Sequence, residues 1–242
     1  MIVTGQPPGS AESRRLTNNN GGRAVRYDIT NIAIEDYLLD LMPPRDAVLT
    51  ELEERARIRG LSLVGPVQGQ FLYLQALNMN ARKALEIGIT TGYAAMYLLR
   101  ALKQTGGHLT AIERHADRVQ LAEEIIANEG MNEYITICPG DWAELLPTLD
   151  QDFDFVFLDV LRSAANEGQA IQALELCVPR LRTGGVLIAD NVLCSAQVLE
   201  LEEDAPPVVR GIQEFNKRLM SHAQLESVII PLRDGVAICR KK

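Results

Sequence analysis

Three oxygen-bearing side chains follow two apolar runs in the second half of the chain. Asp159 follows the run at 155–158, and Asp190 and Asn191 follow the run at 186–189. Consecutive strands of a parallel sheet finish on the same side of it, which would bring the three groups together. Two carboxylates and an amide oxygen suit Mg²⁺, or another divalent cation such as Mn²⁺ or Ca²⁺, which acidifies a bound hydroxyl. Alternatively, such aspartates only cap helices and satisfy turns.

A turn with two glycines lies earlier, in residues 83–93. An apolar run containing Glu86 ends just before Gly88, and a helical pattern begins at Gly92, which predicts a strand, a turn and a helix. Thr90 stands where a dinucleotide fold has its middle glycine, so the pyrophosphate fingerprint is absent. Glu86 would repel a pyrophosphate but suit an ammonium group. S-Adenosylmethionine offers an amine and a nucleoside without phosphates; a plain turn with a solvated Glu86 is the alternative.

Two more acids follow the next predicted strands. Glu113 lies 25 positions after Gly88, where it could accept both ribose hydroxyls of a nucleoside, or could act as an N-cap or first-turn acid for the helix at 115. Asp141 follows Pro139-Gly140, where it could accept from the adenine amino group while Trp142 lies against the ring. Asp141 could equally cap the helix that starts at Trp142, and the two roles are compatible.

The elements that must position these residues alternate between strand and helix. Strands are expected at 83–87, 108–112, 134–138, 153–158, 185–189, 225–230 and 236–239, with helices between them near 92–104, 115–129, 142–149, 167–182 and 207–222. This succession predicts an α/β fold with a doubly wound, mostly parallel sheet of seven strands covered on both faces. The connection at 231–235 is too short for a helical crossover, so the last two strands should form a hairpin with one reversed strand.

The N-terminal part has a different composition. Residues 1–24 are rich in Gly, Pro, Ser and Asn and predict a flexible arm. Residues 25–242 should form one α/β domain, whose first part, 25–80, is a helical cap. Its helices are expected from Asn31 to the prolines at 43–44, from Asp46 to about Arg59, and over 68–77.

Bulk composition excludes several classes of protein. The net charge is −8, and Lys and Arg do not cluster beyond the terminal 240–242, which argues against a nucleic-acid partner. No apolar run has the length of a membrane span, and the N-terminus lacks the pattern of a secretory signal. The four cysteines are scattered without C-x-x-C spacing, which favours reduced thiols and a cytoplasmic location.

Six segments together are specific to one family, at residues 69–72, 85–93, 110–113, 155–159, 184–191 and 232–240. Through them the chain, from about 31 to 240, resembles the cation-dependent, S-adenosylmethionine-dependent O-methyltransferases of the catechol and caffeoyl-CoA type. The resemblance implies a Rossmann-like methyltransferase fold and suggests a homodimer. It also implies that Glu86 and Gly88 contact the methionine part of the cofactor.

By the same resemblance, the ribose is bound by Glu113, the adenine side by Asp141 and Trp142, and the metal by Asp159, Asp190 and Asn191. Residues beside these positions complete the predicted cofactor-binding set, namely Thr90, Tyr93, Arg114, Gly140 and Asp159.

One position departs from the family pattern. Three residues after the first metal-ligand aspartate the family usually has a lysine, proposed as the base that deprotonates the substrate, whereas this chain has Arg162. Arginine keeps its proton at ordinary pH, so Arg162 cannot be a general base, although it could stabilise an oxyanion. Either the metal alone acidifies the hydroxyl, or the substrate is more acidic, or another group takes the proton. His108, His115 and His222 are expected to be structural.

The predicted activity is therefore methyl transfer to a small-molecule hydroxyl with vicinal oxygens, with Asp159, Arg162, Asp190 and Asn191 as the catalytic set. A non-aromatic hydroxy acid, enol or carrier-bound unit is the alternative acceptor, because an arginine can bind a carboxylate in two-pronged fashion. The loop after Asn191 also has Leu193 and Cys194 where the family often has an aromatic residue. A cofactor-binding protein without catalysis is the alternative of another class.

Overall fold

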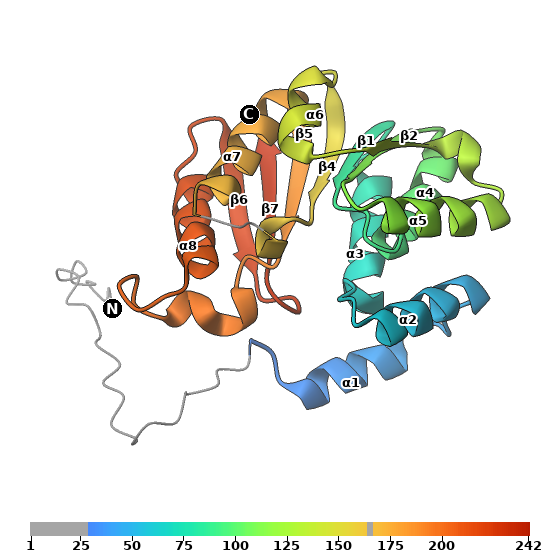
Figure 1. Ribbon diagram of the computed structural model, residues 1–242, viewed down its shortest axis with the longest axis horizontal. Helices are drawn as coiled ribbons and strands as arrows, with labels where there is room; N and C mark the ends of the chain where they lie inside the picture. Colours follow the sequence, from blue (N-terminus) through green and yellow to red (C-terminus); the bar gives the residue numbers. More distant parts are fainter. Residues whose placement is uncertain (1–28, 164–166) are drawn as a thin grey trace, which may run out of the picture.

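A computed structural model describes residues 29–163 and 167–242 of the chain. The predicted arm at 1–24 lies outside these residues. The described chain forms one seven-stranded sheet with the strand order β3-β2-β1-β4-β5-β7-β6 (Figure 1). Its strands are β1 (Lys83–Ile87), β2 (His108–Glu113), β3 (Ile135–Pro139), β4 (Phe153–Leu158), β5 (Leu181–Asp190), β6 (Leu225–Ile230) and β7 (Val236–Lys241).

Strands β1 to β5 are mutually parallel, and β7 runs antiparallel to both of its neighbours, β5 and β6. The predicted mostly parallel sheet with one reversed strand is therefore confirmed. The reversal follows from the short turn between β6 and β7, which leaves no room for a crossover helix.

The helices occupy the predicted positions with three differences. They are α1 (Ile32–Leu41), α2 (Ala47–Arg59), α3 (Gly65–Asn78), α4 (Tyr93–Thr105), α5 (Ala116–Asn128), α6 (Trp142–Leu145), α7 (Glu167–Cys177) and α8 (Pro207–Met220). The helix predicted at 142–149 is shorter, since a 3-10 turn containing Pro147 follows α6. The helix predicted at 167–182 likewise ends at Cys177, before a 3-10 turn containing Pro179. Proline has no backbone N–H to continue the α-helical ladder. The third difference is that α3 begins at Gly65 rather than near 68.

Strand β5 begins earlier than predicted, at Leu181 rather than at 185. Thr183 and Gly184 were expected to precede the strand, but the extended chain runs through them. Phe153 of β4 pairs with Leu181, and the register then shifts before Phe155 pairs with Val186. This irregularity accommodates the glycines, which are typical of bulges within strands.

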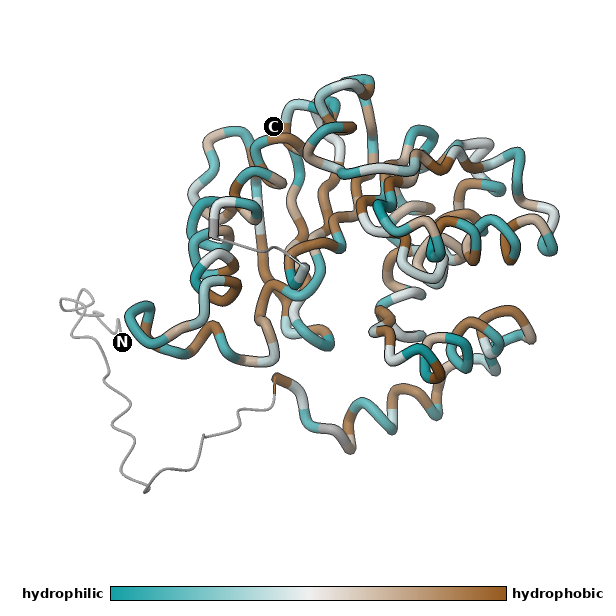
Figure 2. Tube along the Cα trace, in the orientation of Figure 1, coloured by the Kyte–Doolittle hydropathy of each residue, from teal (hydrophilic) through white to brown (hydrophobic). Residues whose placement is uncertain are grey.

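Helices cover both faces of the sheet. On one face, α3, α4 and α5 contribute side chains such as Leu72, Leu98 and Leu121 to a buried core. On the other face, α7 and α8 contribute Leu174 and Phe215 to a second core. Figure 2 shows hydrophobic residues concentrated along the central strands between these layers. Among the described residues, no helix is both long and apolar enough to cross a membrane.

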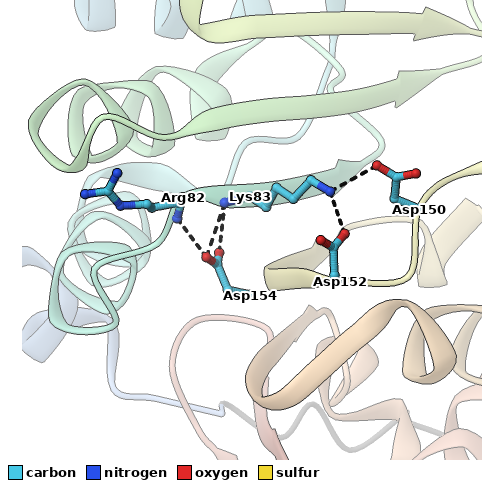
Figure 3. A network of polar contacts seen from close by, with 5 residues as sticks. All are labelled: Arg82, Lys83, Asp150, Asp152 and Asp154. Atoms are coloured by element: carbon cyan, nitrogen blue, oxygen red, sulfur yellow. Dashed lines mark hydrogen bonds and ion pairs between the residues drawn. The ribbon is translucent and has the colours of Figure 1, made fainter.

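Strand β1 is anchored at its first residues by an acid at the start of β4. The carboxylate of Asp154, which is only 7% exposed, accepts hydrogen bonds from the backbone nitrogens of Arg82 at 2.8 Å and Lys83 at 3.2 Å (Figure 3). The Lys83 ammonium group pairs with Asp150 and Asp152 on the surface. One carboxylate thus satisfies two donors at the amino end of the strand that leads to the glycine turn.

We expect Asp154→Ala to lower the free energy of unfolding by roughly 2–4 kcal/mol, because two backbone donors lose their acceptor. Asp152→Ala serves as the matched control. Its carboxylate is exposed and, among the described residues, pairs with Lys83, so its loss should cost about 1 kcal/mol or less. Urea denaturation of both variants measures the difference, and equal midpoints would contradict this role of Asp154.

Candidate active site

Four carboxylates gather on one face of the sheet at the carboxyl ends of its strands. Successive side chains of a strand point to opposite faces. Residues of these strands that pack in the core beside α7 and α8 are Leu85, Ile87, Ile112, Val156, Leu158, Leu187 and Ala189. Glu86, Glu113, Asp159 and Asp190 have the opposite parity. They therefore lie on the face that α3 and α4 cover.

A pocket with a volume of about 310 Å³ opens at these strand ends. It brings together ten of the predicted site residues, namely Gly88, Thr90, Glu113, Arg114, Gly140, Trp142, Asp159, Arg162, Asp190 and Asn191. The loop between α2 and α3 closes another side with Leu61, Ser62, Leu63 and Val64. Glu86, Tyr93 and Asp141 are not among the lining residues. The pocket therefore brings most of the predicted cofactor residues and all three predicted metal ligands into one space.

Backbone conformation explains the glycine turn after β1. Gly88 has a φ of +95°, and a Cβ at this position would lie 2.6 Å from the backbone oxygen of Asp159. The turn is also tied to β2, since the backbone nitrogen of Thr90 donates to Oε2 of Glu113 at 3.1 Å. Gly92, with a φ of +82°, then begins α4. Glycine permits both the conformation and the close approach.

Glu113 performs two jobs. Its Oε1 accepts from the backbone nitrogen of His115 at 2.9 Å, and His115 is the N-cap residue of α5. The same carboxylate lines the pocket and lies 4.0 Å from the guanidinium of Arg118. The N-cap residue of α5 is thus His115 and its first-turn acid is Asp117, so Glu113 has neither of the helix-start roles that were the alternative to ribose binding, and its carboxylate lies at the pocket wall.

Asp141 caps α6 by accepting from the backbone nitrogen of Ala143 at 2.8 Å, as the alternative role predicted. Its neighbours Gly140 and Trp142 line the pocket. Trp142 is 9% exposed, so most of its ring packs in the core and one part faces the pocket.

Tyr93 lies away from the pocket lining. Its hydroxyl donates to Oε1 of Glu53 on α2 at 2.7 Å, and its ring meets that of Tyr97 edge to face. In this structure Tyr93 therefore joins α4 to α2.

Glu86 is buried, contrary to the alternative in which it is a solvated strand-end residue. The residue is 1% exposed, and neither carboxylate oxygen has a hydrogen-bond partner among the described residues. Burial, followed by the negative charges of Asp159 and Glu113, raises the pKa of Glu86 well above its usual range. A positively charged group bound nearby would relieve this repulsion.

The two predicted metal carboxylates also repel each other. Burial, then the charges of Asp190 and Glu113, raises the pKa of Asp159 well above its usual range. Burial raises the pKa of Asp190 too, while the side chain of Gln68, the backbone N–H of Asn191 and the charge of Arg233 act in the opposite direction. Oxygen ligands with excess negative charge fit a divalent cation and a cationic cofactor.

Asn191 supplies an amide beside these carboxylates. It has a φ of +61°, a conformation that asparagine tolerates better than most residues. Its side-chain nitrogen donates to Oδ2 of Asp234 at 3.3 Å. The described residues contain no group of three or more His, Cys, Asp or Glu side chains arranged to hold a metal. The predicted set differs in kind, because it combines two carboxylates with one amide.

Arg162 lines the pocket and is held by two other segments. Its Nη1 donates to Oγ of Ser195 at 2.8 Å and to Oδ2 of Asp234 at 2.9 Å. Asp234, Gln68 and Arg118 are residues of this region that were not predicted. Asp234 lies in the Arg-Asp-Gly segment before β7, but a turn acid gives no local signal of a partner 72 residues away.

Known proteins resemble this chain over most of its length. A family model described as O-methyltransferase matches residues 45–242. A catechol O-methyltransferase of Niastella koreensis is 27% identical over 217 residues, covering 85% of this chain and 95% of the relative. A caffeoyl-CoA O-methyltransferase of Populus kitakamiensis is 29% identical over 225 residues, covering 86% and 93%.

A solved O-methyltransferase of Bacillus cereus, in complex with SAH, has a TM-score of 0.76 and 25% identity, covering 87% of this chain and 97% of that one. The predicted resemblance and the Rossmann-like fold are thus confirmed. The chain belongs to the O-methyltransferase family and is an S-adenosylmethionine-dependent enzyme that methylates oxygen.

Proposed function

We propose that this O-methyltransferase depends on a divalent cation, Mg²⁺ or a similar ion, and methylates a small molecule with vicinal oxygens of the catechol or phenolic type. The observation that carries the proposal is the presence of Asp159, Asp190 and Asn191 in the pocket that also holds Gly88 and Glu113. The names of the catechol and caffeoyl-CoA relatives support the same acceptor class.

The cofactor would lie across the carboxyl ends of β1, β2 and β3. We propose that Glu86 stabilises the positive charge of the methionine part, because its buried carboxylate has no other partner among the described residues. Gly88, Thr90 and Glu113 line the pocket. Gly88 and Thr90 would give the ligand access to the backbone, and Glu113 would accept from the ribose hydroxyls. Gly140 and Trp142 would border the adenine.

Catalysis would rest on positioning. Asp159, Asp190 and Asn191 would hold the cation, whose positive charge would lower the pKa of an acceptor hydroxyl. The same Asp159 lies against Gly88, so the acceptor and cofactor sides of the pocket share one fixed wall. The sulfonium methyl group is already activated, and rigid alignment of donor and acceptor accounts for much of the rate.

Arg162 is proposed to support the pocket rim rather than to take a proton. A guanidinium keeps its proton, and here Asp234 compensates its charge at 2.9 Å. The proton of the acceptor would therefore leave to solvent from an acidified hydroxyl. The pairing with Asp234 favours a neutral catechol over a carboxylate-bearing hydroxy acid, which would compete with Asp234 for the guanidinium.

Removal of divalent ions tests cation dependence. We expect exhaustive dialysis against EDTA to abolish methylation of a catechol and added Mg²⁺ to restore it, because the hydroxyl then loses its electrostatic activation. Calorimetric binding of S-adenosylhomocysteine should persist in EDTA. Undiminished turnover after chelation would refute the proposal, and faster methylation of an α-hydroxy acid than of a catechol would replace its acceptor class.

A homodimer is proposed from the apolar side chains of α1. Ile34, Tyr37, Leu38 and Leu41 recur at helical spacing and are exposed, at 57%, 61%, 39% and 64%. The helix lies at the periphery, beyond α2 (Figure 1). A second copy of the chain would cover this face. Light scattering in solution should therefore give the mass of a dimer, and the mass of a monomer would contradict the proposal.

A cytoplasmic location is proposed from cysteine chemistry. All four cysteines are free, and Cys177, Cys194 and Cys239 are buried. Free thiols persist in reducing compartments.

A further inference from the structure

The turn between β6 and β7 is joined to the loop that follows β5. The backbone nitrogens of Val192 and Leu193 donate to the carbonyl oxygens of Gly235 at 3.2 Å and Asp234 at 2.9 Å. A Cβ on Gly235 would lie 2.3 Å from Cγ of Leu193, so the two segments are in close contact. This contact places the turn next to the residues that directly follow Asn191.

The carboxylate of Asp234 connects three segments. Its Oδ2 accepts from Nη1 of Arg162 at 2.9 Å and from Nδ2 of Asn191 at 3.3 Å, and its Oδ1 accepts from the backbone nitrogen of Ser195. Its side chain is 19% exposed. Asp234, which lies in the β6–β7 turn, therefore binds both the segment after β4 and the segment after β5.

This contact determines which end of the Asn191 amide is available. A carboxylate can only accept, so it binds the NH₂ end of the amide and leaves the Oδ1 end for another partner. Hard divalent cations take oxygen ligands and not amide nitrogens. A rotation of the amide by half a turn would present the wrong atom and place two oxygens together at Asp234.

The same carboxylate stabilises the loop beside the acceptor side of the pocket. Cys194, Ser195 and Ala196 have φ values of +48°, +53° and +64°, a conformation rare for residues with a side chain. Asp234 accepts a hydrogen bond from the backbone N–H of Ser195, and Arg162 donates one to the hydroxyl of Ser195. Both contacts stabilise the loop at residues 194–196 in this conformation.

We infer that Asp234 is a positioning residue that directs the amide oxygen of Asn191 toward the cation and holds Arg162 at the pocket rim. The inference rests on the proposed cation dependence. It also gives Arg162 a role that its chemistry permits, because a planar guanidinium can contact Ser195 and Asp234 at once.

The experiment compares cation and cofactor binding in the full chain. We expect Asp234→Ala to raise the Kd for Mn²⁺, measured by electron paramagnetic resonance, by roughly 10–100-fold, as for residues that orient metal ligands. The Kd for S-adenosylhomocysteine, measured by calorimetry, should change by less than about 3-fold, since the hydrogen bonds of the Asp234 side chain go to Arg162, Asn191 and Ser195 and not to Gly88 or Glu113 in the described part of the chain. A merely structural role would weaken both.

Glu226→Gln is the matched control, because Glu226 is an exposed acid of the same hairpin whose partner within the described ranges is Arg240, at 3.8 Å. It should leave both constants unchanged. Asp234→Glu keeps the acceptor and should restore part of the Mn²⁺ affinity; it also serves if the alanine variant does not fold. Wild-type Mn²⁺ affinity in a folded Asp234→Ala protein would overturn the inference. Absence of Mn²⁺ binding by the wild-type chain would instead overturn the proposed function.

Discussion

Asp190→Ala should lower kcat for a catechol by roughly 10³-fold or more, which corresponds to about 4 kcal/mol of transition-state stabilisation. Asp190 is 4% exposed and lines the same pocket as Asn191 and Arg162. Loss of its carboxylate removes one of two charged oxygens proposed for the cation. The substrate hydroxyl would then keep its proton. The acceptor would also no longer be held in one orientation.

Cofactor binding separates this effect from unfolding. Asp190 belongs to the acceptor side, so calorimetry should still detect S-adenosylhomocysteine binding to Asp190→Ala, at least in part. Asp159→Ala should abolish turnover as well, with a greater effect on the cofactor, because Asp159 packs against Gly88. Asp150→Asn changes an exposed surface acid and should retain full activity. If Asp190→Ala kept a tenth of the wild-type kcat, the proposed ligand set would be wrong.

Gly88→Ala should destabilise the protein by roughly 2–4 kcal/mol and weaken S-adenosylhomocysteine binding at least about 10-fold. The φ of Gly88 is +95°, and an added Cβ would meet the backbone oxygen of Asp159 at 2.6 Å and Cγ1 of Val160 at 3.1 Å. A backbone atom at a strand end cannot move without displacing β4. The pocket floor would therefore shift under the cofactor.

Gly106→Ala isolates the conformational part of this penalty. Gly106 ends α4 with a φ of +70°, and a Cβ there would have no neighbour within 4 Å. Its substitution should cost about 1 kcal/mol and leave cofactor affinity unchanged. Thermal denaturation and calorimetry compare the two variants; equal losses would show that crowding at Asp159 has no part in the effect.

Local patterns predicted most of the fold because they report local constraints. Apolar runs between turn residues located β1, β4 and β6 to the residue, and the short 231–235 connection predicted the reversed strand. The largest boundary differences involve proline or glycine. Pro147 and Pro179 ended helices early, and β5 continued through Gly184 and Gly185, because pairing with neighbouring strands outweighed the turn preference of glycine.

Some features of the candidate site were predictable from the sequence and others were not. Strand-end position alone predicted that Asp159, Asp190 and Asn191 would share a pocket, and they line the same one. The partner of Tyr93 was not predictable, since its hydroxyl binds Glu53, 40 residues earlier in the chain. The burial of Glu86 was equally hidden, because it depends on the helices that cover that face of the sheet.

The sequence by itself determined the order of strands and helices, the glycine turn and the acids at the strand ends, since each follows from periodicity and residue type within a few positions. Only the tertiary structure decided that the carboxylate of Asp234 accepts hydrogen bonds from Arg162, Asn191 and Ser195. The physical reason is that these contacts join segments separated by 39 to 72 residues, and such pairs form only when the sheet brings their loops together.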